Sequence, residues 1–474
     1  MTGVTETSTI NAALAANVAQ QPDKPALGTI WDGVLVWVTW EQLHGQVQKR
    51  VAELGEQGFS GGDAVEENRS NEFDWIVHTL AVMRIGATLV PPGFDGRLPG
   101  EPPPATVVTT SGTGAEPRRV MLSHENLLAN ARALSEASGG SGDELRLTFL
   151  PFHHLYARTG DLHIWLLRGS RLVLAESRET VFRDCQIVHP TVVNGVPYFF
   201  QKAIDLADAQ GLSLRELFGG EIKRCYCGGA ALAPAVERRF FDEGVPLYTG
   251  YGLTEASPVV TVNTPDTHKL GTVGKPLPGV EVRTADDGEV LVRGPNVMLG
   301  YWNNPEPTAE VLKDGWLHTG DLGSLDEEGF LTITGRKKEL VVLSTGKNVA
   351  PSRVEAMLAA SPWIEQACVI GDGEKGLRAL VVPSRDRLRA LIKRERLWVW
   401  SKRRAVSHPR VREVFREAID GALTGAAREE QVHDFFVLPR GFSQELGEMT
   451  AKLSLRREVI RANFARQIQT IDKR

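Results

Sequence analysis

Apolar and polar positions along the first two-thirds of the chain alternate between helical and strand-like patterns. Residues 39–58 place apolar side chains at helical spacing and end in glycine, which predicts a helix. Residues 74–92 predict a helix, a glycine turn and a short strand stopped by two prolines. The segments 168–177 and 185–197 are short, apolar and rich in β-branched residues, which predicts two buried strands. This alternation predicts an α/β protein with largely parallel sheets.

The pattern changes between residues 271 and 335 to short strands separated by turn residues. The steps Asp287-Gly288 and Glu328-Gly329 are typical of hairpins, so this stretch is predicted to be a compact β subdomain. A smaller α/β unit is expected after it.

The composition excludes several classes of protein. Of 474 residues, 42% are hydrophobic and 24% are charged, values that argue against disorder and against a coiled coil. The net charge of −5 provides no overall positive field, so no nucleic-acid partner is expected. We expect neither a membrane-spanning helix nor a secretory signal, because no long apolar run occurs. Cys185, Cys225, Cys227 and Cys368 have no zinc-binding spacing and favour a reducing, cytoplasmic location.

A loop of small hydroxyl residues and glycine follows a predicted strand at residues 106–110. The sequence Ser111-Gly112-Thr113-Gly114 precedes a helix that is expected to start near Ser123. Backbone N–H groups and hydroxyls in such a loop can surround a polyphosphate. The alternative is an ordinary solvent-exposed loop.

Four further segments carry residues suited to nucleotide chemistry. In residues 248–260, Tyr251 offers a flat face to a purine, Thr254 a hydroxyl, and Glu255 an oxygen ligand for Mg²⁺. Asp321 lies between glycines in a predicted turn, where its carboxylate could accept bonds from two ribose hydroxyls. Each feature has an ordinary alternative, such as a capped turn, a solvated basic face or a surface lysine. The remaining two segments are the basic 335–355 and the lysine-containing 447–460.

Taken together and in this order, the segments resemble the adenylate-forming (ANL) superfamily. Within it, the chain is most similar to bacterial long-chain fatty-acyl-CoA synthetases that form AMP. The resemblance extends over nearly the whole chain. It is carried by residues 150–160, 190–202, 228–234, 257–282, 288–323 and 336–358.

The resemblance implies the fold and the activity. A large N-terminal domain, residues 1–337, would contain α/β sandwich subdomains and a small β-barrel-like subdomain. A smaller, mobile α+β domain would follow in residues 338–474. The expected reaction is ATP-dependent activation of a fatty acid to acyl-AMP and transfer to CoA, with ATP, Mg²⁺ and CoA bound.

The resemblance also implies which residues hold the nucleotide. Tyr251 would lie against adenine, Thr254 near the α-phosphate, and Glu255 on Mg²⁺. Asp321 would hold the ribose hydroxyls, with Arg336 supporting ribose and phosphate. The other implied nucleotide-binding residues are Gly252 and the phosphate loop Thr110, Ser111, Gly112 and Thr113, of which Thr113 is also a metal ligand.

On the acyl side, His154 matches the position beside the acyl carboxylate. Gly228, Gly229 and Ala230 would form the wall between nucleotide and acyl chain, where a larger residue would intrude.

In the small domain, Lys338 matches the hinge, and Gly346 matches a backbone position close to CoA. The catalytic lysine of the family aligns with Ser454, so Lys452, two residues earlier, is expected to replace it. Residues i and i+2 of an extended segment point to the same side.

Two departures from the family pattern keep other functions open. The phosphate loop reads TSGTGAEPRR, with Arg118 in place of the usual lysine, and about seventy residues are missing around 91–107. These departures motivate one alternative, a degenerate nucleotide-binding protein without turnover. A separate, enzymatic alternative is an acyl-AMP ligase that serves a carrier protein.

The basic segment 384–404 also has two interpretations. It is either a solvated helical face or a surface for peripheral association with the inner membrane. Acyl chain length and oligomeric state stay open.

Overall fold

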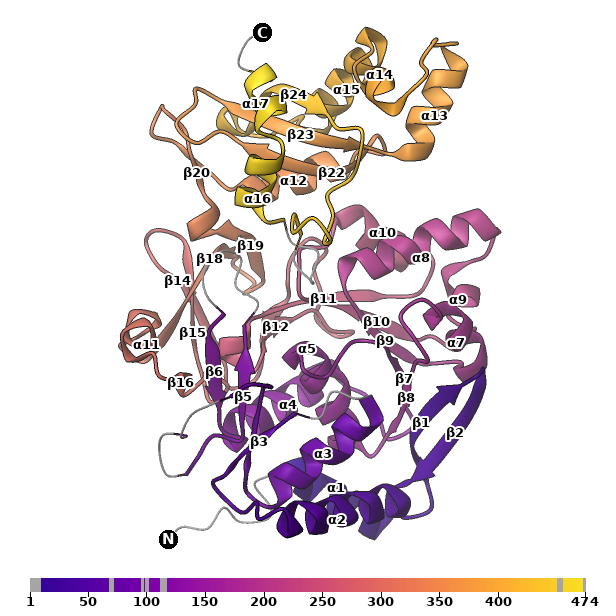
Figure 1. Ribbon diagram of the computed structural model, residues 1–474, viewed down its shortest axis with the longest axis vertical. Helices are drawn as coiled ribbons and strands as arrows, with labels where there is room; N and C mark the ends of the chain where they lie inside the picture. The colour runs from indigo at the N-terminus through magenta and orange to yellow at the C-terminus, as the bar shows by residue number, and fades with distance from the viewer. Residues whose placement is uncertain are drawn as a thin grey trace. The chain divides into compact units, whose positions relative to one another are not determined.

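The structure is a computed structural model that describes residues 10–67, 72–94, 98, 102–110, 117–449 and 455–471 (Figure 1). The chain forms two compact units. The first comprises Met1–Leu232, Val236–Thr319 and Leu325–Thr332, and the second comprises Ala233–Ala235, Gly320–Ser324 and Ile333–Arg474.

The largest sheet has nine strands in the order β13-β12-β11-β10-β9-β7-β8-β1-β2. The six strands from β11 to β1 run parallel, and antiparallel strands complete both edges. This arrangement confirms the predicted α/β class. The strands are β1 (Pro25–Trp31), β2 (Val34–Thr39), β7 (Leu145–Thr148), β8 (Arg171–Leu174), β9 (Val192–Gly195), β10 (Arg224–Cys227), β11 (Leu247–Gly252), β12 (Val259–Val262) and β13 (Lys275–Pro276).

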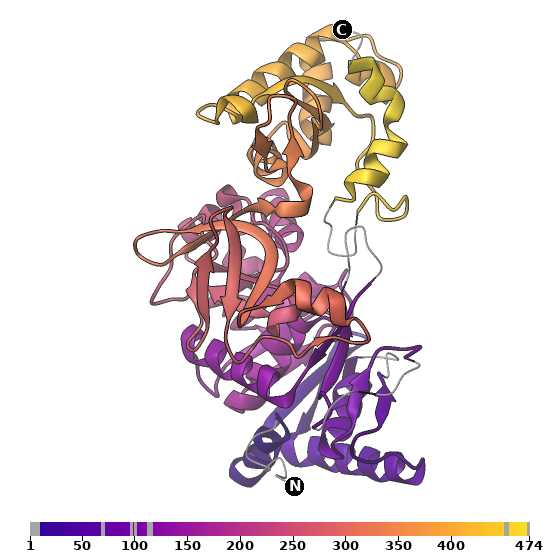
Figure 2. The same cartoon turned by 90° about the vertical axis from the view of Figure 1, so that its left-hand side faces the viewer.

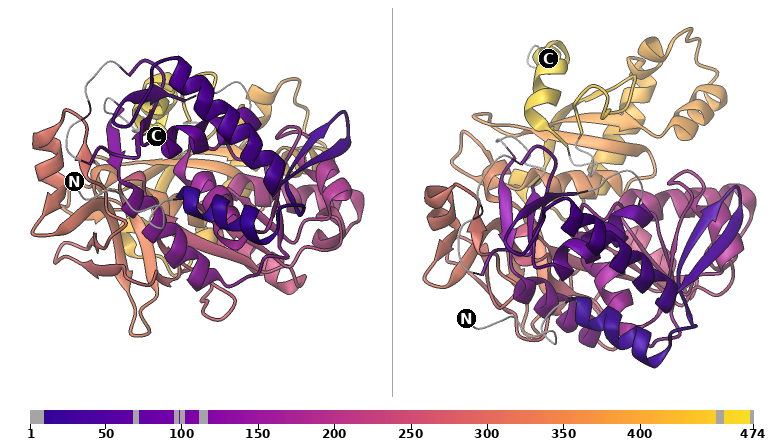
Figure 3. Two further views of the ribbon diagram at one scale, coloured as in Figure 1. Left: turned by 90° about the horizontal axis from the view of Figure 1, so that it is seen from below. Right: turned by 60° about the horizontal axis from the view of Figure 1, so that its bottom comes forward.

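Helix α2 (Trp40–Glu56) confirms the helix predicted at 39–58. It begins at a capping box in which Thr39 and Gln42 exchange hydrogen bonds between side chain and backbone. Its Trp40 stacks on Trp165 in the core, with ring centroids 4.9 Å apart. Helices α1 (Ile10–Gln20), α2 and α3 (Glu72–Arg84) pack together at one end of the first unit (Figure 3).

The strand predicted at 185–197 is wrong in its first half. Those residues complete helix α7 (Val181–Val188), and only Val192–Gly195 form a strand. His189 ends the helix in the left-handed region, at a φ of 52°, and Pro190 follows it. The other helices before residue 250 are α4 (His124–Ser138), α5 (Leu155–Ala157), the π-helical turn η2 (Arg158–His163), α6 (Ile164–Arg168), α8 (Pro197–Gln210), α9 (Leu214–Leu217) and α10 (Pro234–Asp242).

A five-stranded sheet, in the order β16-β6-β5-β4-β3, carries the base of the predicted phosphate loop. Strands β4 and β5 are parallel neighbours, so the proline-rich connector between them joins adjacent strands. Strands β5 and β6 are antiparallel, with Thr109 opposite Arg119. The strands are β3 (Ala64–Glu66), β4 (Thr88–Val90), β5 (Thr106–Thr109), β6 (Arg119–Leu122) and β16 (Gly300–Tyr301).

The β subdomain predicted at 271–335 is present as a second five-stranded sheet, visible in salmon in Figure 2. Gly288 and Gly329 lie at its turns with φ of 82° and 84°, as the hairpin signals predicted. Its strands are β14 (Glu281–Thr284), β15 (Glu289–Arg293), β17 (Leu312–Lys313), β18 (Trp316–Leu325) and β19 (Leu331–Arg336); helix α11 (Pro305–Val311) precedes β17.

The second unit is α+β, in agreement with the prediction. Its sheet has the order β22-β23-β24, and Val354 and Phe415 lie in the core that the sheet shares with its helices. The proposed boundary at 337/338 falls near the start of the segment Ile333–Arg474 and stays a proposal. The elements are η4 (Lys337–Glu339), β20 (Val341–Val342), β21 (Asn348–Val349), α12 (Pro351–Ala359), β22 (Ile364–Ile370), β23 (Leu377–Pro383), α13 (Arg385–Arg394), α14 (Lys402–Val406), α15 (Pro409–Ala422), η5 (Arg428–Glu430), β24 (Val432–Val437), α16 (Arg457–Asn463) and α17 (Ala465–Ile471).

Candidate active site

Several candidate residues follow the carboxyl ends of parallel strands in the large sheet. His154 lies after β7, Gly228 directly follows β10, and Gly252 ends β11. Asn194 and Gly195 end β9, which lies between β7 and β10. In parallel sheets these ends share one edge, where α/β proteins bind their ligands. The sequence thus brings residues from four segments to one edge of the first unit.

Thr110 closes the base of the phosphate loop. Its backbone N–H donates to the Arg118 carbonyl at 2.8 Å, and the Arg118 N–H donates to the Thr110 hydroxyl at 3.2 Å. These hydrogen bonds between Thr110 and Arg118 close the end of the antiparallel β5–β6 pair. Ser111, Gly112 and Thr113, which were predicted to grip the phosphates, lie outside the described residues.

Tyr301 connects this end of the β5–β6 pair to Glu255. Its phenol donates a 2.9 Å hydrogen bond to Glu255 Oε1, and Arg118 Cζ lies 4.9 Å from the centroid of its ring. Burial and the neighbouring Glu255 carboxylate raise the pKa of the Tyr301 phenol, so it stays a neutral donor. Sequence reasoning missed Tyr301, because nothing in its own segment indicates a partner 46 residues away.

Glu255 lies in the short 3₁₀ turn η3 (Thr254–Ala256), directly after β11. Its carbonyl accepts from the Met298 N–H at 2.9 Å, which fixes the backbone of the turn. At Gly252 an added Cβ would lie 2.0 Å from the Pro258 carbonyl oxygen, so the chain can turn back only with glycine there. Tyr251, the predicted adenine contact, is half-buried on β11 in the same segment.

On the predicted acyl side, His154 precedes helix α5, and its ring centroid lies 4.3 Å from that of His153. Gly228 faces Tyr156: an added Cβ would lie 3.1 Å from the tyrosine ring. At Gly229 the requirement is conformational, because its φ is 85° while the nearest atom would be 3.9 Å from a Cβ. Ala230 follows and is exposed.

Asp161 forms a buried polar cluster in η2. Its carboxylate accepts from the Thr148 hydroxyl at 2.8 Å and from the Asn194 amide at 2.7 Å. Burial raises the pKa of Asp161 to about 6, against the lowering effect of Arg146. The cluster ties η2, which follows His154 and Tyr156, to the ends of β7 and β9.

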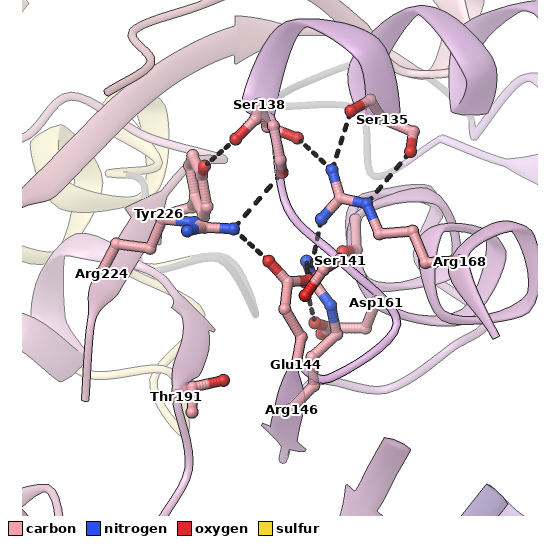
Figure 4. Close-up of polar contacts among 12 residues, drawn as sticks. Ser135, Ser138, Ser141, Glu144, Arg146, Asp161, Arg168, Thr191, Arg224 and Tyr226 are labelled. Atoms are coloured by element: carbon pink, nitrogen blue, oxygen red, sulfur yellow. Dashed lines mark hydrogen bonds and ion pairs between the residues drawn. The ribbon is translucent and has the colours of Figure 1, made fainter. Parts of the chain in front are cut away.

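A second network surrounds Glu144 at the opposite, amino ends of these strands (Figure 4). Glu144 precedes β7 and pairs with Arg146, Arg168 and Arg224. Burial would raise the pKa of Glu144, but the three guanidinium groups lower it below its ordinary value. Because this network lies away from the carboxyl ends, we interpret it as structural.

Asp321 is buried and forms an ion pair with Arg336, with Nε and Oδ1 2.9 Å apart. The prediction that Asp321 lies in a turn is wrong: it lies in the ten-residue strand β18, and Arg336 ends the neighbouring strand β19. Gly320 supplies the local irregularity with a φ of 70°.

Lys338 is exposed in η4. Gly346 lies in the turn between β20 and β21 with a φ of 79°. Lys452, the predicted catalytic lysine, lies outside the described residues.

Comparison with known proteins gives the class of this chain. A family description of AMP-binding enzymes matches residues 94–302, and that of the AMP-binding enzyme C-terminal domain matches residues 338–474. The chain belongs to the AMP-binding, adenylate-forming enzymes.

Among curated relatives, the long-chain-fatty-acid–CoA ligase FadD15 of Mycobacterium bovis is 33% identical to this chain. The aligned region covers 81% of this chain and 72% of FadD15. A long-chain-fatty-acid–CoA ligase of Escherichia coli is 34% identical, and the aligned region covers 55% of this chain and 49% of that ligase.

Solved structures show the same fold at lower identity. ATP-bound MatB from Rhodopseudomonas palustris gives a TM-score of 0.76 at 21% identity, covering 96% of this chain and 99% of that one. o-Succinylbenzoate CoA synthetase from Bacillus subtilis, bound to its acyl-adenylate intermediate, gives a TM-score of 0.73 at 21% identity. This match covers 94% of this chain and 97% of the synthetase. Within the part of the chain that the structure describes, no helix is long and apolar enough to cross a membrane.

Proposed function

We propose that this protein joins a fatty acid to CoA at the expense of ATP, releasing AMP and pyrophosphate. The observation that carries the proposal is that His154, Gly228 and Gly252–Glu255 all lie at the carboxyl edge of one parallel sheet. The names of relatives above 30% identity support fatty acid and CoA as the substrates.

In the first step, a carboxylate oxygen of the fatty acid attacks the α-phosphorus of ATP. The bond from that phosphorus to the bridging oxygen breaks, and pyrophosphate leaves. In the second step, the CoA thiolate attacks the acyl carbon and AMP leaves. The obstacle in the first step is repulsion between an anion and a polyanion, so positioned donors and positive charge lower the barrier.

Glu255 fits a magnesium ion that is held mainly by the nucleotide. Mg²⁺ is commonly bound through one or two carboxylates together with substrate phosphates. Among the described residues, no group of three or more His, Cys, Asp or Glu side chains could hold a metal by itself. Bound there with Thr113, the ion would neutralise phosphate charge, and the Tyr301 hydrogen bond would orient the Glu255 carboxylate.

The nucleotide sugar would be held by Asp321, whose carboxylate Arg336 orients. Tyr251 would stack on the adenine, and Thr254 would donate to the α-phosphate. The second unit would supply Lys452 to the first step, and the Gly346 turn would contact CoA after rotation about Lys338.

The test follows pyrophosphate and acyl-CoA after the protein is mixed with ATP, Mg²⁺ and oleate, with and without CoA. We expect oleoyl-CoA and AMP in equal amounts. Pyrophosphate release with no CoA consumed would favour transfer to a carrier protein. ATP binding without pyrophosphate release would identify a degenerate nucleotide-binding protein.

Lys452→Ala tests the assignment of the lysine. We expect loss of pyrophosphate release while supplied oleoyl-AMP is still converted to oleoyl-CoA. Lys375→Ala, at an exposed lysine of the same unit, is the matched control. Unchanged pyrophosphate release in Lys452→Ala would refute the assignment.

A further inference from the structure

Two neighbouring tryptophan side chains in the second unit are exposed to solvent. Trp398 is 87% exposed and Trp400 is 75% exposed, with ring centroids 5.9 Å apart. Both lie in the loop between α13 and α14 (Figure 1). A single exposed apolar side chain is ordinary, but large apolar side chains gathered at one place commonly mark a contact surface.

The loop that carries these rings is anchored at both ends. Leu397 packs on the core of the unit, and its N–H donates to the Ile392 carbonyl at 3.0 Å. At the other end, the Ser401 hydroxyl caps α14 by accepting from the Arg404 N–H at 3.3 Å. The tryptophans are thus held outward from fixed backbone positions.

Positive charge surrounds the pair. Residues 385–404 contain nine basic and two acidic side chains, whereas the chain as a whole has 54 basic and 59 acidic residues. Both acidic residues, Asp386 and Glu395, form ion pairs with arginines of the same surface. All nine basic residues are exposed: Arg385, Arg387, Arg389, Lys393, Arg394, Arg396, Lys402, Arg403 and Arg404.

We propose that this tryptophan–basic surface, residues 385–404, docks the protein on an anionic lipid bilayer. Lysine and arginine are attracted to acidic headgroups, and tryptophan inserts at the boundary between headgroups and acyl chains. The degree of exposure favours this partner. Rings with three-quarters or more of their area in water can be covered on all sides by a fluid lipid layer, whereas a stacked nucleic-acid base covers one face.

The proposal does not depend on the ligase activity, because binding is measured without substrates. The full chain is sedimented with vesicles of phosphatidylglycerol and phosphatidylcholine, and separately with phosphatidylcholine alone. We expect binding to the anionic vesicles that weakens as salt rises. Trp398→Ser with Trp400→Ser, and separately Arg387→Glu with Lys393→Glu, should each weaken that binding tenfold or more.

Matched controls distinguish binding through this surface from nonspecific binding of the protein to vesicles. Trp31→Ser removes a tryptophan that is 80% exposed in the first unit, and Lys49→Glu reverses an exposed charge there; both should bind like the unaltered protein. Circular dichroism establishes that each variant is folded. Lipids brominated high in the acyl chain should quench part of the tryptophan emission, and that quenching should disappear in the double tryptophan variant.

Equal binding of the double tryptophan variant would overturn the proposal, as would absence of binding to anionic vesicles. Tighter binding to a single-stranded oligonucleotide or to an acidic carrier protein than to the vesicles would assign the surface to that partner instead.

Discussion

At the scale of single residues, Tyr301 joins two motifs that are far apart in the sequence. Its ring contacts Arg118 at the base of the phosphate loop, and its phenol donates to Glu255. Strand pairing makes this possible, because Tyr301 lies opposite Val120 on β6. We therefore expect Tyr301 to position the carboxylate while making no contact with the substrate itself.

Tyr301→Phe tests this role. A hydrogen bond to a charged group contributes about 1.5–3 kcal/mol, so kcat/KM for ATP should fall roughly ten- to hundredfold. The concentration of Mg²⁺ needed for half-maximal rate should rise, which a purely structural loss would not cause. Tyr198→Phe, at an exposed tyrosine, is the control. An unchanged Mg²⁺ dependence would contradict the positioning role.

Tyr156 gives a second prediction at this scale, and it rests on the proposed function. Its ring lies against Gly228, and its phenol donates to the Tyr226 carbonyl at 3.0 Å. Removing the ring beside the proposed acyl wall creates space, so Tyr156→Ala should shift the preference toward longer fatty acids. Tyr156→Phe keeps the ring and should keep the preference. Rates measured from C6 to C20 check both; identical profiles for the two variants would contradict the prediction.

The sequence predicts chemistry at residues whose own segment indicates it, such as Glu255 and Asp321, and their roles stay predictions. It did not single out Tyr301 or Tyr156, because the contacts behind their proposed roles come from neighbours brought close only by folding. It also placed Asp321 in a turn, since flanking glycines are typical of turns, although Gly320 is accommodated within β18.

At the scale of elements, the segment with a clear helical period was predicted correctly. Of the two short apolar runs predicted as strands, residues 168–177 contain the strand β8, and residues 185–197 form a strand only in their second half. Residues 39–58 have helical spacing and a capping box, and they form α2. Residues 185–197 are apolar without a period, and such a run fits a buried helix end as well as a buried strand. The break at His189 and Pro190 decides the outcome.

The π-helical turn η2 gives a prediction about pH. His163 is buried in it, its Nδ1 has no hydrogen-bond partner among the described residues, and burial together with Arg158 lowers its pKa to about 3. Between about pH 6.5 and 3 the unfolded chain therefore binds a proton that the folded chain does not. Folding stability should fall with decreasing pH in that window, by up to about 1.4 kcal/mol per unit from this group.

His163→Phe should remove this contribution. The free energy of unfolding of the variant, relative to the original protein, should increase steadily as the pH falls from 7 to 5. Urea unfolding at several pH values measures the difference, and His44→Phe, at a half-buried histidine on α2, is the control. A difference that does not change with pH would show that the pKa of His163 is the same in the folded and the unfolded chain.

At the scale of the whole molecule, the division into two units follows from the change of pattern after residue 335. The α/β class of the first unit was predictable because it depends on the order of elements along the chain. The α+β class of the second unit followed from the family resemblance, whereas the pattern alone indicated a small α/β unit. The contacts that hold the first unit together were not, because they join residues far apart in sequence. The network around Glu144 is such a case: it links α4, α6, β7 and β10 through three arginines.

Glu144→Gln should therefore destabilise the whole first unit. The substitution leaves Arg146, Arg168 and Arg224 close together with their shared carboxylate gone (Figure 4). Removing one partner of a buried ion pair typically costs about 3–5 kcal/mol, whereas a surface pair contributes about 0–1 kcal/mol. Glu53→Gln, which breaks the exposed pair with Arg50, is the matched control. Thermal unfolding should show a midpoint several degrees lower for Glu144→Gln and almost no change for Glu53→Gln. Equal midpoints would mean that the three arginines find other partners, and that the unit is held together by its apolar core.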